Sequence, residues 1–401
     1  MLERAADAFL SHNEEEALAH LLDVWERTRA TRLAELITQL STRLTARFTP
    51  PESSPWRRAS TRYKTTDLPR RIERFRGAAD DRRPRRLDEA ADSHCDALER
   101  ALSEREATEA RLGPTLEALF AQVYENPDDD SPRLVLADAL MELGEPRGRC
   151  MMLELRGEHE LARACDWNVA QWLFPLGPYG DPPLWSSFER GFPAVISPDF
   201  PRDEPLVPPG PAWATVREIA LDGCYRDSPR QLADWLMHPN LRRVEALQKV
   251  VPWLARELCT RPLPVKRLEL VIPGGEDGLG TQEPGFFTHL ASLPHLARVD
   301  IRAASPEDVS LCANSPLAPR LERFTAEGDM GWSLVAAPSG EVTVEAWLRN
   351  RDGVYGLAPA LRGAARFGTR ALRIHLAANL DPEEREMLTE AAALYARVEW
   401  D

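Results

Sequence analysis

A short pattern of apolar and polar positions recurs about eight times between Val216 and Asp401. Each copy has one apolar residue, two other residues, and then three residues in the order apolar, polar, apolar. This alternation predicts half-buried β-strands, because successive side chains of a strand point to opposite faces. The copies are Val216–Leu221, Leu241–Ala246, Val265–Leu270, Leu296–Ile301, Leu321–Ala326, a weaker one around Thr343–Glu345, Ala371–Leu376 and Tyr395–Trp400.

Helix-like stretches separate these predicted strands. They are Gln231–Met237, Pro252–Cys259, Phe286–Leu293, Glu307–Cys312, Leu357–Ala365 and Pro382–Leu394. A strand followed by a helix, repeated at intervals of roughly 20 to 31 residues, is typical of a stacked repeat array. We therefore expect residues 211–401 to form an α/β solenoid with a curved parallel sheet.

The N-terminal half is helical by pattern. Residues 1–48 predict a hairpin of two antiparallel helices, broken near Thr28–Thr31, and residues 49–86 predict a basic linker or arm. Residues 87–165 predict a further helical region, with a long charged helix that stops at Gly113-Pro114 and a second helix over 115–125. The apolar positions of the hairpin are Leu18, Leu21, Leu22, Trp25, Leu33, Leu36, Ile37 and Leu40.

A connector rich in Pro and Gly over residues 166–210 joins this half to the array. The expected fold class is therefore α+β and multidomain. An all-helical N-terminal region precedes the α/β array.

The segment Asn126–Gly148 has the most distinctive local pattern, NPDDDSPRLVLADALMELGEPRG. Asp130 or Ser131 is expected to cap a helix that begins at Pro132, since the first turn of a helix tolerates proline. Gly144 is expected to end this helix. The expected buried face is Leu134, Ala137, Leu140 and Met141, and Asp138 is expected to pair with Arg133 or Arg147.

This segment resembles the bacterial repeat-companion domain, a helical module whose usual pattern is close to N-P-D-D-D-x-P-R-L-V-Y-A-D-W-L-E-E-x-G-D-P-R-G-E. The resembling module covers about residues 115–157 and departs from the family at Leu136 and Ala139, where Tyr and Trp are frequent. Family members commonly have leucine-rich-like repeats behind the module, and Phe188–Pro193 resembles their junction. The resemblance implies an interaction module followed by leucine-rich-repeat-like repeats, and it implies no catalytic activity.

Composition restricts the location and the partners. The chain has 401 residues and a net charge of −14, which disfavours general attraction to nucleic acid or anionic lipid. No apolar run is long enough to span a bilayer, and the N-terminus lacks the layout of a signal peptide. Six scattered cysteines indicate free thiols in a reducing compartment. We therefore expect a cytoplasmic protein with no membrane partner.

Charge reverses locally between Arg57 and Arg86, where twelve Arg and Lys face four acidic residues. One interpretation is a strap lying on acidic parts of the same molecule, and another is a solvated linker. A third is an arm that binds nucleic acid or another phosphate polymer, because backbone phosphates attract clustered arginines.

The outward positions of the repeats predict a charged face. The first holds Glu218, Arg243, Arg267, Arg298, Arg323, Thr343, Arg373 and Arg397, and the second holds Ala220, Glu245, Glu269, Asp300, Thr325, Glu345, His375 and Glu399. Equivalent residues of a parallel in-register sheet lie about 4.8 Å apart, so six arginines are expected in one row beside carboxylates.

Two interpretations of this face remain open. Exposed ion pairs worth ~0–1 kcal/mol each would keep the face soluble, whereas arginines also recognise carboxylate or phosphate groups of a partner. Trp347 and His375 interrupt the charge pattern and are the expected anchors. The candidate partner-binding residues are Arg243, Glu245, Arg267, Glu269, Arg298, Asp300, Arg323, Glu345, Trp347, Arg373, His375 and Arg397.

No motif supports catalysis, a metal or a cofactor. Asp128–Asp130 lacks the spacing of a calcium loop, and Gly274–Gly280 lacks the glycine order of a dinucleotide site. C-x-x-C and G-x-S-x-G patterns are absent from the sequence. The leading hypothesis is a non-enzymatic protein–protein interaction scaffold, an adaptor or regulatory subunit of a bacterial multi-protein system. The alternatives are nucleic-acid binding through Arg57–Arg86 and an enzyme with an unrecognised site.

Overall fold

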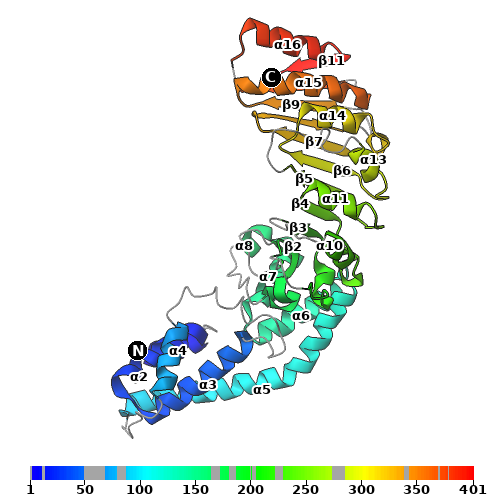
Figure 1. Cartoon of the computed structure of the whole chain (residues 1–401). Coiled ribbons are helices and arrows are strands. Elements are labelled where there is room, and N and C mark those ends of the chain that lie inside the picture. The colour runs from blue at the N-terminus through cyan, green and yellow to red at the C-terminus, as the bar shows by residue number, and fades with distance from the viewer. Residues whose placement is uncertain are drawn as a thin grey trace. The chain divides into compact units, whose positions relative to one another are not determined.

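The computed structural model describes residues 2–10, 14–48, 68–78, 87–163, 172–179, 187–198, 200, 205–221, 229–272, 285–337, 343–368, 371–377 and 379–401. Within them, an N-terminal helical region precedes a mixed, mostly parallel α/β sheet of 11 strands (Figure 1). The chain divides into two compact units. One comprises Met1–Asp181 with Glu189–Phe192, and the other comprises Pro182–Phe188 with Pro193–Asp401.

The predicted break of the N-terminal helices near Thr28–Thr31 is confirmed, although a further helix precedes the pair. At the end of the second helix, the Thr28 hydroxyl donates to the Val24 carbonyl oxygen, 3.0 Å away. The helices are α1 (Leu2–Leu10), α2 (Glu14–Thr28), α3 (Thr31–Phe48), α4 (Leu68–Gly77), α5 (Glu89–Glu125), α6 (Ser131–Glu142), α7 (Pro146–Leu155) and α8 (His159–Arg163).

The apolar stripe expected in α2 and α3 forms the core of this helical region. All eight of its predicted positions are buried, and Cys95, Leu98 and Leu102 of α5 complete the cluster. Helix α4 also packs here, since Phe75 is buried edge-on against Trp25 with ring centroids 4.7 Å apart. Part of the basic segment is therefore a packed helix.

Helix α5 runs unbroken for 37 residues, so the expected end at Gly113-Pro114 is wrong. Proline inside a helix removes one hydrogen bond and costs ~3 kcal/mol. Leu98 packs in the N-terminal core before the proline, and Leu119 packs in a second core after it. Burial at both ends offsets the local cost, and sequence rules for helix ends do not include such distant packing.

Helix α6 begins at Ser131, one residue before the expected Pro132, and its cap and its buried face also differ from the prediction. The Ser131 N–H donates to Asp129 Oδ1 at 2.9 Å, and this bond lowers the pKa of the Asp129 carboxyl. Leu134 and Met141 are exposed, while Leu136 takes their place in the core. The residues of α6 that are buried are Pro132, Arg133, Leu136, Ala137 and Leu140.

The sheet has its strands in chain order from β1 to β11, with helices stacked along one face (Figure 1). The strands are β1 (Ser187–Glu189), β2 (Phe192–Ile196), β3 (Glu218–Ala220), β4 (Ala246–Val250), β5 (Arg267–Val271), β6 (Arg298–Arg302), β7 (Arg323–Gly328), β8 (Trp332–Ala336), β9 (Thr343–Leu348), β10 (Ala371–Leu376) and β11 (Arg397–Trp400). The helices are α10 (Pro229–Leu236), α11 (Pro252–Leu258), α13 (Phe286–Leu290), α14 (Pro306–Ala313), α15 (Val354–Ala364) and α16 (Pro382–Ala392). Short 3-10 helices are η2 (Phe174–Tyr179), η3 (Pro211–Thr215), η4 (Pro239–Leu241), η5 (Ala318–Arg320), η6 (Arg351–Gly353) and η7 (Ala365–Phe367).

Two features of the sheet depart from the expected parallel array. It starts at Ser187, upstream of the expected first residue 211. Strand β8 pairs antiparallel with both β7 and β9, so a fully parallel sheet is wrong at this point. The turn Asp329-Met330-Gly331 between β7 and β8 is short, and Gly331 there has φ 79°, which favours glycine.

Alternation along the strands confirms which residues face the helices. Leu268, Val299 and Phe324 lie next to one another in register and are buried under the helical layer. The residues that precede and follow each of them along its strand therefore belong to the open face of the sheet. No helix among the described residues has the length and apolar character needed to cross a membrane.

Candidate interaction site on the open face of the sheet

Consecutive arginines of the predicted row stand on neighbouring strands only in its middle. Arg267, Arg298 and Arg323 are Cα partners on the neighbouring strands β5, β6 and β7, as expected. Arg243 is not in this row, because Ala246 takes the place opposite Arg267 and Arg243 precedes the strand. A bulge in β4, with Lys249 at φ 54°, accompanies this shift.

The last two arginines of the expected row differ in their outcome: Arg373 is displaced, whereas Arg397 keeps its expected register with Thr343, through Ala371. Arg373 is opposite Glu345 and Glu399, because β10 is displaced by two residues from the expected register. It donates to Glu399 Oε2 at 2.8 Å, and this bond lowers the pKa of the Glu399 carboxyl. Arg397 is opposite Ala371. Two-residue displacement keeps each side chain on its face, so the apolar pattern alone does not reveal it.

Arg267 is the centre of an ion-pair network. Its Nε lies 2.8 Å from Asp300 Oδ2, and its other nitrogens lie 3.6 Å from Glu218 Oε1 and 3.8 Å from Glu269 Oε2. Arg302 Nε is 2.9 Å from Glu269 Oε1. These carboxylates are ion-paired within the protein, although Glu269 Oε1 accepts no hydrogen bond among the described residues. This part of the face therefore fits the interpretation of a charge ladder.

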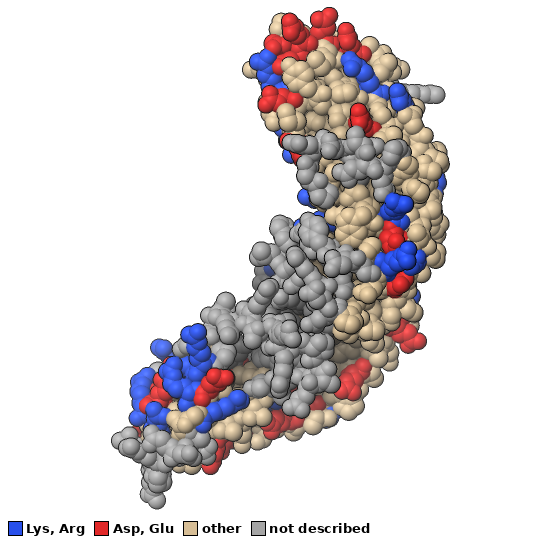
Figure 2. Space-filling view, viewed as in Figure 1, with Lys and Arg blue, Asp and Glu red and all other residues tan. Residues whose placement is uncertain are grey.

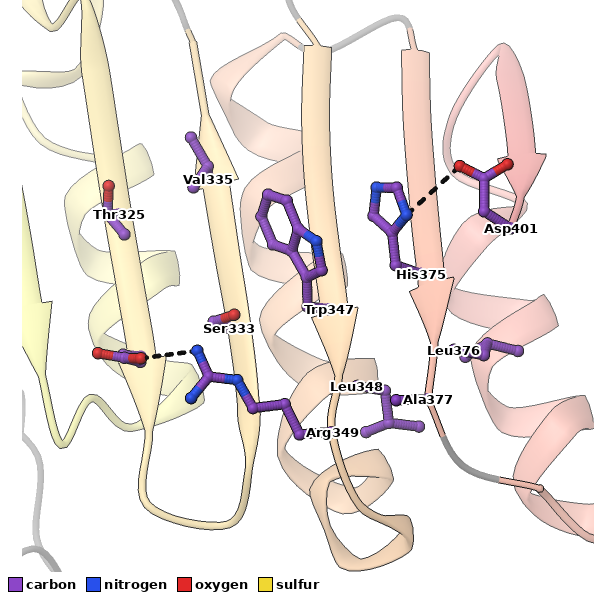
Figure 3. A pocket seen from close by; sticks show the side chains of 11 residues that line it. Thr325, Ser333, Val335, Trp347, Leu348, Arg349, His375, Leu376, Ala377 and Asp401 are labelled. Atoms are coloured by element: carbon purple, nitrogen blue, oxygen red, sulfur yellow. Dashed lines mark hydrogen bonds and ion pairs between the residues drawn. The ribbon is translucent and has the colours of Figure 1, made fainter.

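A hollow of about 600 Å³ lies farther along the same face, over β7 to β11 (Figure 3). Its floor is strand β8, whose outward side chains Ser333 and Val335 are small. We call it the β8 hollow. Its lining residues are Thr325, Glu327, Ser333, Val335, Trp347, Leu348, Arg349, His375, Leu376, Ala377 and Asp401.

Trp347 and His375 form one wall of the β8 hollow. They are Cα partners on β9 and β10, and their rings stack with centroids 5.3 Å apart and an interplanar angle of 11°. His375 Nδ1 lies 3.4 Å from Asp401 Oδ2, which orients the imidazole (Figure 3). The structure therefore brings together the two residues that the sequence selected as anchors.

Polar groups line the rest of the β8 hollow. Arg349 Nη2 donates to Glu327 Oε1 at 3.1 Å across Ser333 (Figure 3). Thr325 Oγ1 is buried and has no hydrogen-bond partner among the described residues. Such a hydroxyl can donate to or accept from a bound group, because burial without a partner costs free energy.

Sequence reasoning selected only part of this lining. Ser333 and Val335 were missed because β8 does not have the repeat pattern. Glu327, Arg349 and Asp401 were missed because each lies just beyond the strand core that defines a copy. Reading the copies one residue farther would have found Glu327 and Asp401, whereas Arg349 lies four residues beyond Glu345.

The helical unit has a second notable cluster, in which two buried arginines lie over the Phe192 ring. The guanidinium carbon of Arg147 is 4.5 Å from the ring centroid, and that of Arg133 is 5.4 Å away. Arg147 Nε donates to the Gly191 carbonyl oxygen at 2.8 Å, and burial lowers its pKa to about 10.

The ion pair expected between Asp138 and Arg133 or Arg147 is replaced by other contacts. Arg147 bonds to Gly191 rather than to Asp138, and Arg133 lies 3.7 Å from Asp130. Asp130 also accepts from Arg190 at 2.7 Å. Arg190 and Gly191 belong to the junction-like segment, so the arginines and Asp130 hold this turn against α6 and α7.

The basic segment is described only in part. Its residues 57–67 and 79–86 lie outside the described residues. In α4, Arg71 Nη2 lies 2.6 Å from Asp23 Oδ1 and its Nε lies 3.4 Å from Glu26 Oε1, as a strap would require. Lys and Arg gather over α4, whereas acidic side chains gather over α16 (Figure 2).

Within the described ranges, no group of three or more His, Cys, Asp or Glu side chains could hold a metal ion. The Gly274–Gly280 loop lies outside these ranges. A scan against protein-family models found no match for this chain, and neither a search of curated proteins nor one of solved structures found a similar protein.

Proposed function

We propose that this chain is a non-enzymatic interaction scaffold, an adaptor or regulatory subunit of a bacterial multi-protein system. Its partner protein binds the open face of the sheet at the β8 hollow. The observation that carries this proposal is the Trp347–His375 stack beside small side chains. Tryptophan is enriched among residues that dominate binding energy, especially beside pockets that exclude water.

The remaining features fit a scaffold. Strands and helices alternate in chain order through most of the sheet, which supports a leucine-rich-repeat-like solenoid with a broad face for a partner. The helix pair α6–α7 supports a repeat-companion module over about residues 115–157. Gly148 permits its close packing, because a Cβ there would lie 2.5 Å from the Ala137 carbonyl oxygen.

A cytoplasmic location is part of the proposal. Cys95, Cys150, Cys259 and Cys312 form no disulfide among the described residues. Thiols remain reduced in the cytosol, whereas secreted proteins of this size commonly form disulfides.

The test is affinity purification of the full chain from its native cells, with partner identification by mass spectrometry. Trp347→Ala and His375→Ala should each reduce recovery of the specific partner at least tenfold, while the circular dichroism spectrum stays unchanged. Trp400→Ala is the matched control, because Trp400 is an exposed tryptophan of the same sheet outside the β8 hollow. Equal recovery with all three variants would overturn the proposal.

A further inference from the structure

Two arginines on the open face are poorly neutralised. Arg298 and Arg323 are Cα partners on β6 and β7, so like charges stand on neighbouring strands. Within the described part of the chain, Arg298 has one ion pair, with Glu322 at 3.5 Å, in which both side chains are more than half exposed. Arg323 has no ion pair among the described residues. Like charges placed opposite each other destabilise a sheet, and an exposed pair at that distance is worth only ~0–1 kcal/mol.

This pair differs from the neighbouring Arg267, although all three residues lie in one row. Three carboxylates surround Arg267 within 4 Å, including Asp300 at 2.8 Å. Asp300 is also the acidic residue nearest along β6 to Arg298, and Arg267 already occupies it. The positive charge of Arg298 and Arg323 is therefore available to a partner, and that of Arg267 is not.

The arginine pair is continuous with the β8 hollow. Arg323 and Thr325 alternate along β7 onto the same open face, and Thr325 lines the hollow. Trp347 lies two strands away and four residues farther along the strand direction. Spacings of ~4.8 Å between strands and ~3.3 Å per residue place its Cα about 16 Å from that of Arg323. An extended chain covers this distance in about five residues.

The arginine pair and the β8 hollow would bind chemically different groups. Arginine pairs bind carboxylates through charge-assisted, often bidentate hydrogen bonds. One face of the Trp347 ring is covered by His375, while the small residues Ser333 and Val335 lie on its other side (Figure 3). A flat ring can stack there, and the buried Thr325 hydroxyl can bond a polar group beside it.

We propose that the β8 hollow and the Arg298–Arg323 pair together bind an extended acidic segment of the partner protein. A carboxylate of this segment lies between the two arginines, and an aromatic side chain about five residues away stacks in the hollow. The inference rests on the proposed function and adds the chemistry of the partner to it.

The experiment uses the full chain as bait and a phage-displayed library of random 12-residue peptides as probe. Peptides that bind are sequenced, synthesised with a fluorophore and measured by anisotropy at low and high salt. We expect Asp or Glu about five residues from Phe, Tyr or Trp, with affinity that falls as salt rises.

Three variants separate the contributions. Arg298→Glu combined with Arg323→Glu, and Trp347→Ala alone, should each raise Kd at least tenfold. Arg362→Glu with Arg385→Glu changes the net charge equally, but these residues lie on α15 and α16, and this control should change Kd less than twofold. Unaltered circular dichroism spectra establish that each variant is folded.

The possible results distinguish the two proposals. Recovery of peptides rich in Lys or Arg would overturn the proposal that the bound segment is acidic. Acidic peptides that bind the Arg298/Arg323 variant normally would overturn it as well. The proposed site would then stand if Trp347→Ala still abolished their binding. If no recovered peptide depends on Trp347, both the acidic segment and the proposed site are wrong.

Discussion

Trp347 and His375 are Cα partners on the parallel strands β9 and β10, and their rings stack face to face at 5.3 Å. This stack connects two neighbouring strands through an aromatic contact, on a face where most other side chains are charged. It also leaves one face of the indole directed to the small residues of β8. The same contact therefore stabilises the sheet and shapes the candidate site.

The stack predicts a measurable coupling between the two side chains. Trp347→Ala, His375→Ala and the double variant should give a coupling free energy of about 0.5 to 1.5 kcal/mol in urea unfolding. Each single variant already loses the ring contact, so the double variant should lose less stability than the sum of the two single losses. A coupling near zero would show that the rings contribute nothing to stability. Val335→Ala combined with His375→Ala is the control pair and should be additive.

The pattern of apolar residues predicted the strands and helices of the array well, because burial under a helical layer imposes alternation. It did not predict β8, which pairs with β7 through a short turn and has no copy of the repeat. It also placed Arg243 and Arg373 wrongly. Alternation specifies the face of a residue, whereas the partner strand is set by turns and bulges such as that in β4.

The sequence selected two residues that line the β8 hollow, but it did not predict the shape of the hollow. Trp347 and His375 stood out as exceptions in a charged pattern, which is local information. The β8 hollow depends on small side chains next to large ones on strands that are brought together only by the fold. Likewise, the unbroken helix α5 depends on two cores that the local sequence around Pro114 does not reveal.

Pro114→Ala should stabilise the protein, because the wild-type proline removes a hydrogen bond inside α5. The gain should approach 3 kcal/mol if the helix is otherwise unchanged, and urea unfolding followed at 222 nm measures it. Pro382→Ala is the control, because Pro382 occupies the first turn of α16, where proline is tolerated. It should change stability by less than about 0.5 kcal/mol. Loss of stability in Pro114→Ala would contradict this account.

Thiol reactivity should follow burial. Burial raises the pKa of Cys95 to about 11 and that of Cys312 well above its usual range, so both are protonated at pH 8. In a Cys165→Ser, Cys224→Ser background, Ellman's reagent should modify the partly exposed Cys259 first. Replacing Cys259 by Ser should remove that fast phase, and a remaining fast phase would place another thiol at the surface.

The same shift predicts how stability depends on pH. The pKa of the Cys95 thiol is near its ordinary value of 9.0 in the unfolded chain, whereas burial raises it to about 11 in the folded protein. Its contribution is therefore complete below pH 9 and is lost as the pH rises toward 11, because the unfolded state binds fewer protons there. Cys95→Ala should show a shallower decline over this range in urea unfolding. An equal decline in both proteins would assign the effect to other groups.

Glu14→Gln should destabilise the helical region more than any surface charge change. The Glu14 carboxylate is only 3% exposed, and it lies 3.0 Å from Arg43 Nε and 2.9 Å from Arg105 Nη1. Removing its charge leaves two partly buried guanidinium groups undercompensated, which costs about 3 to 5 kcal/mol. Urea unfolding measures the loss. Glu16→Gln is the control, since Glu16 is 55% exposed in its pair with His20, and it should change stability by less than about 1 kcal/mol. Equal stability of the two variants would show that the arginines reach water when Glu14 is neutral.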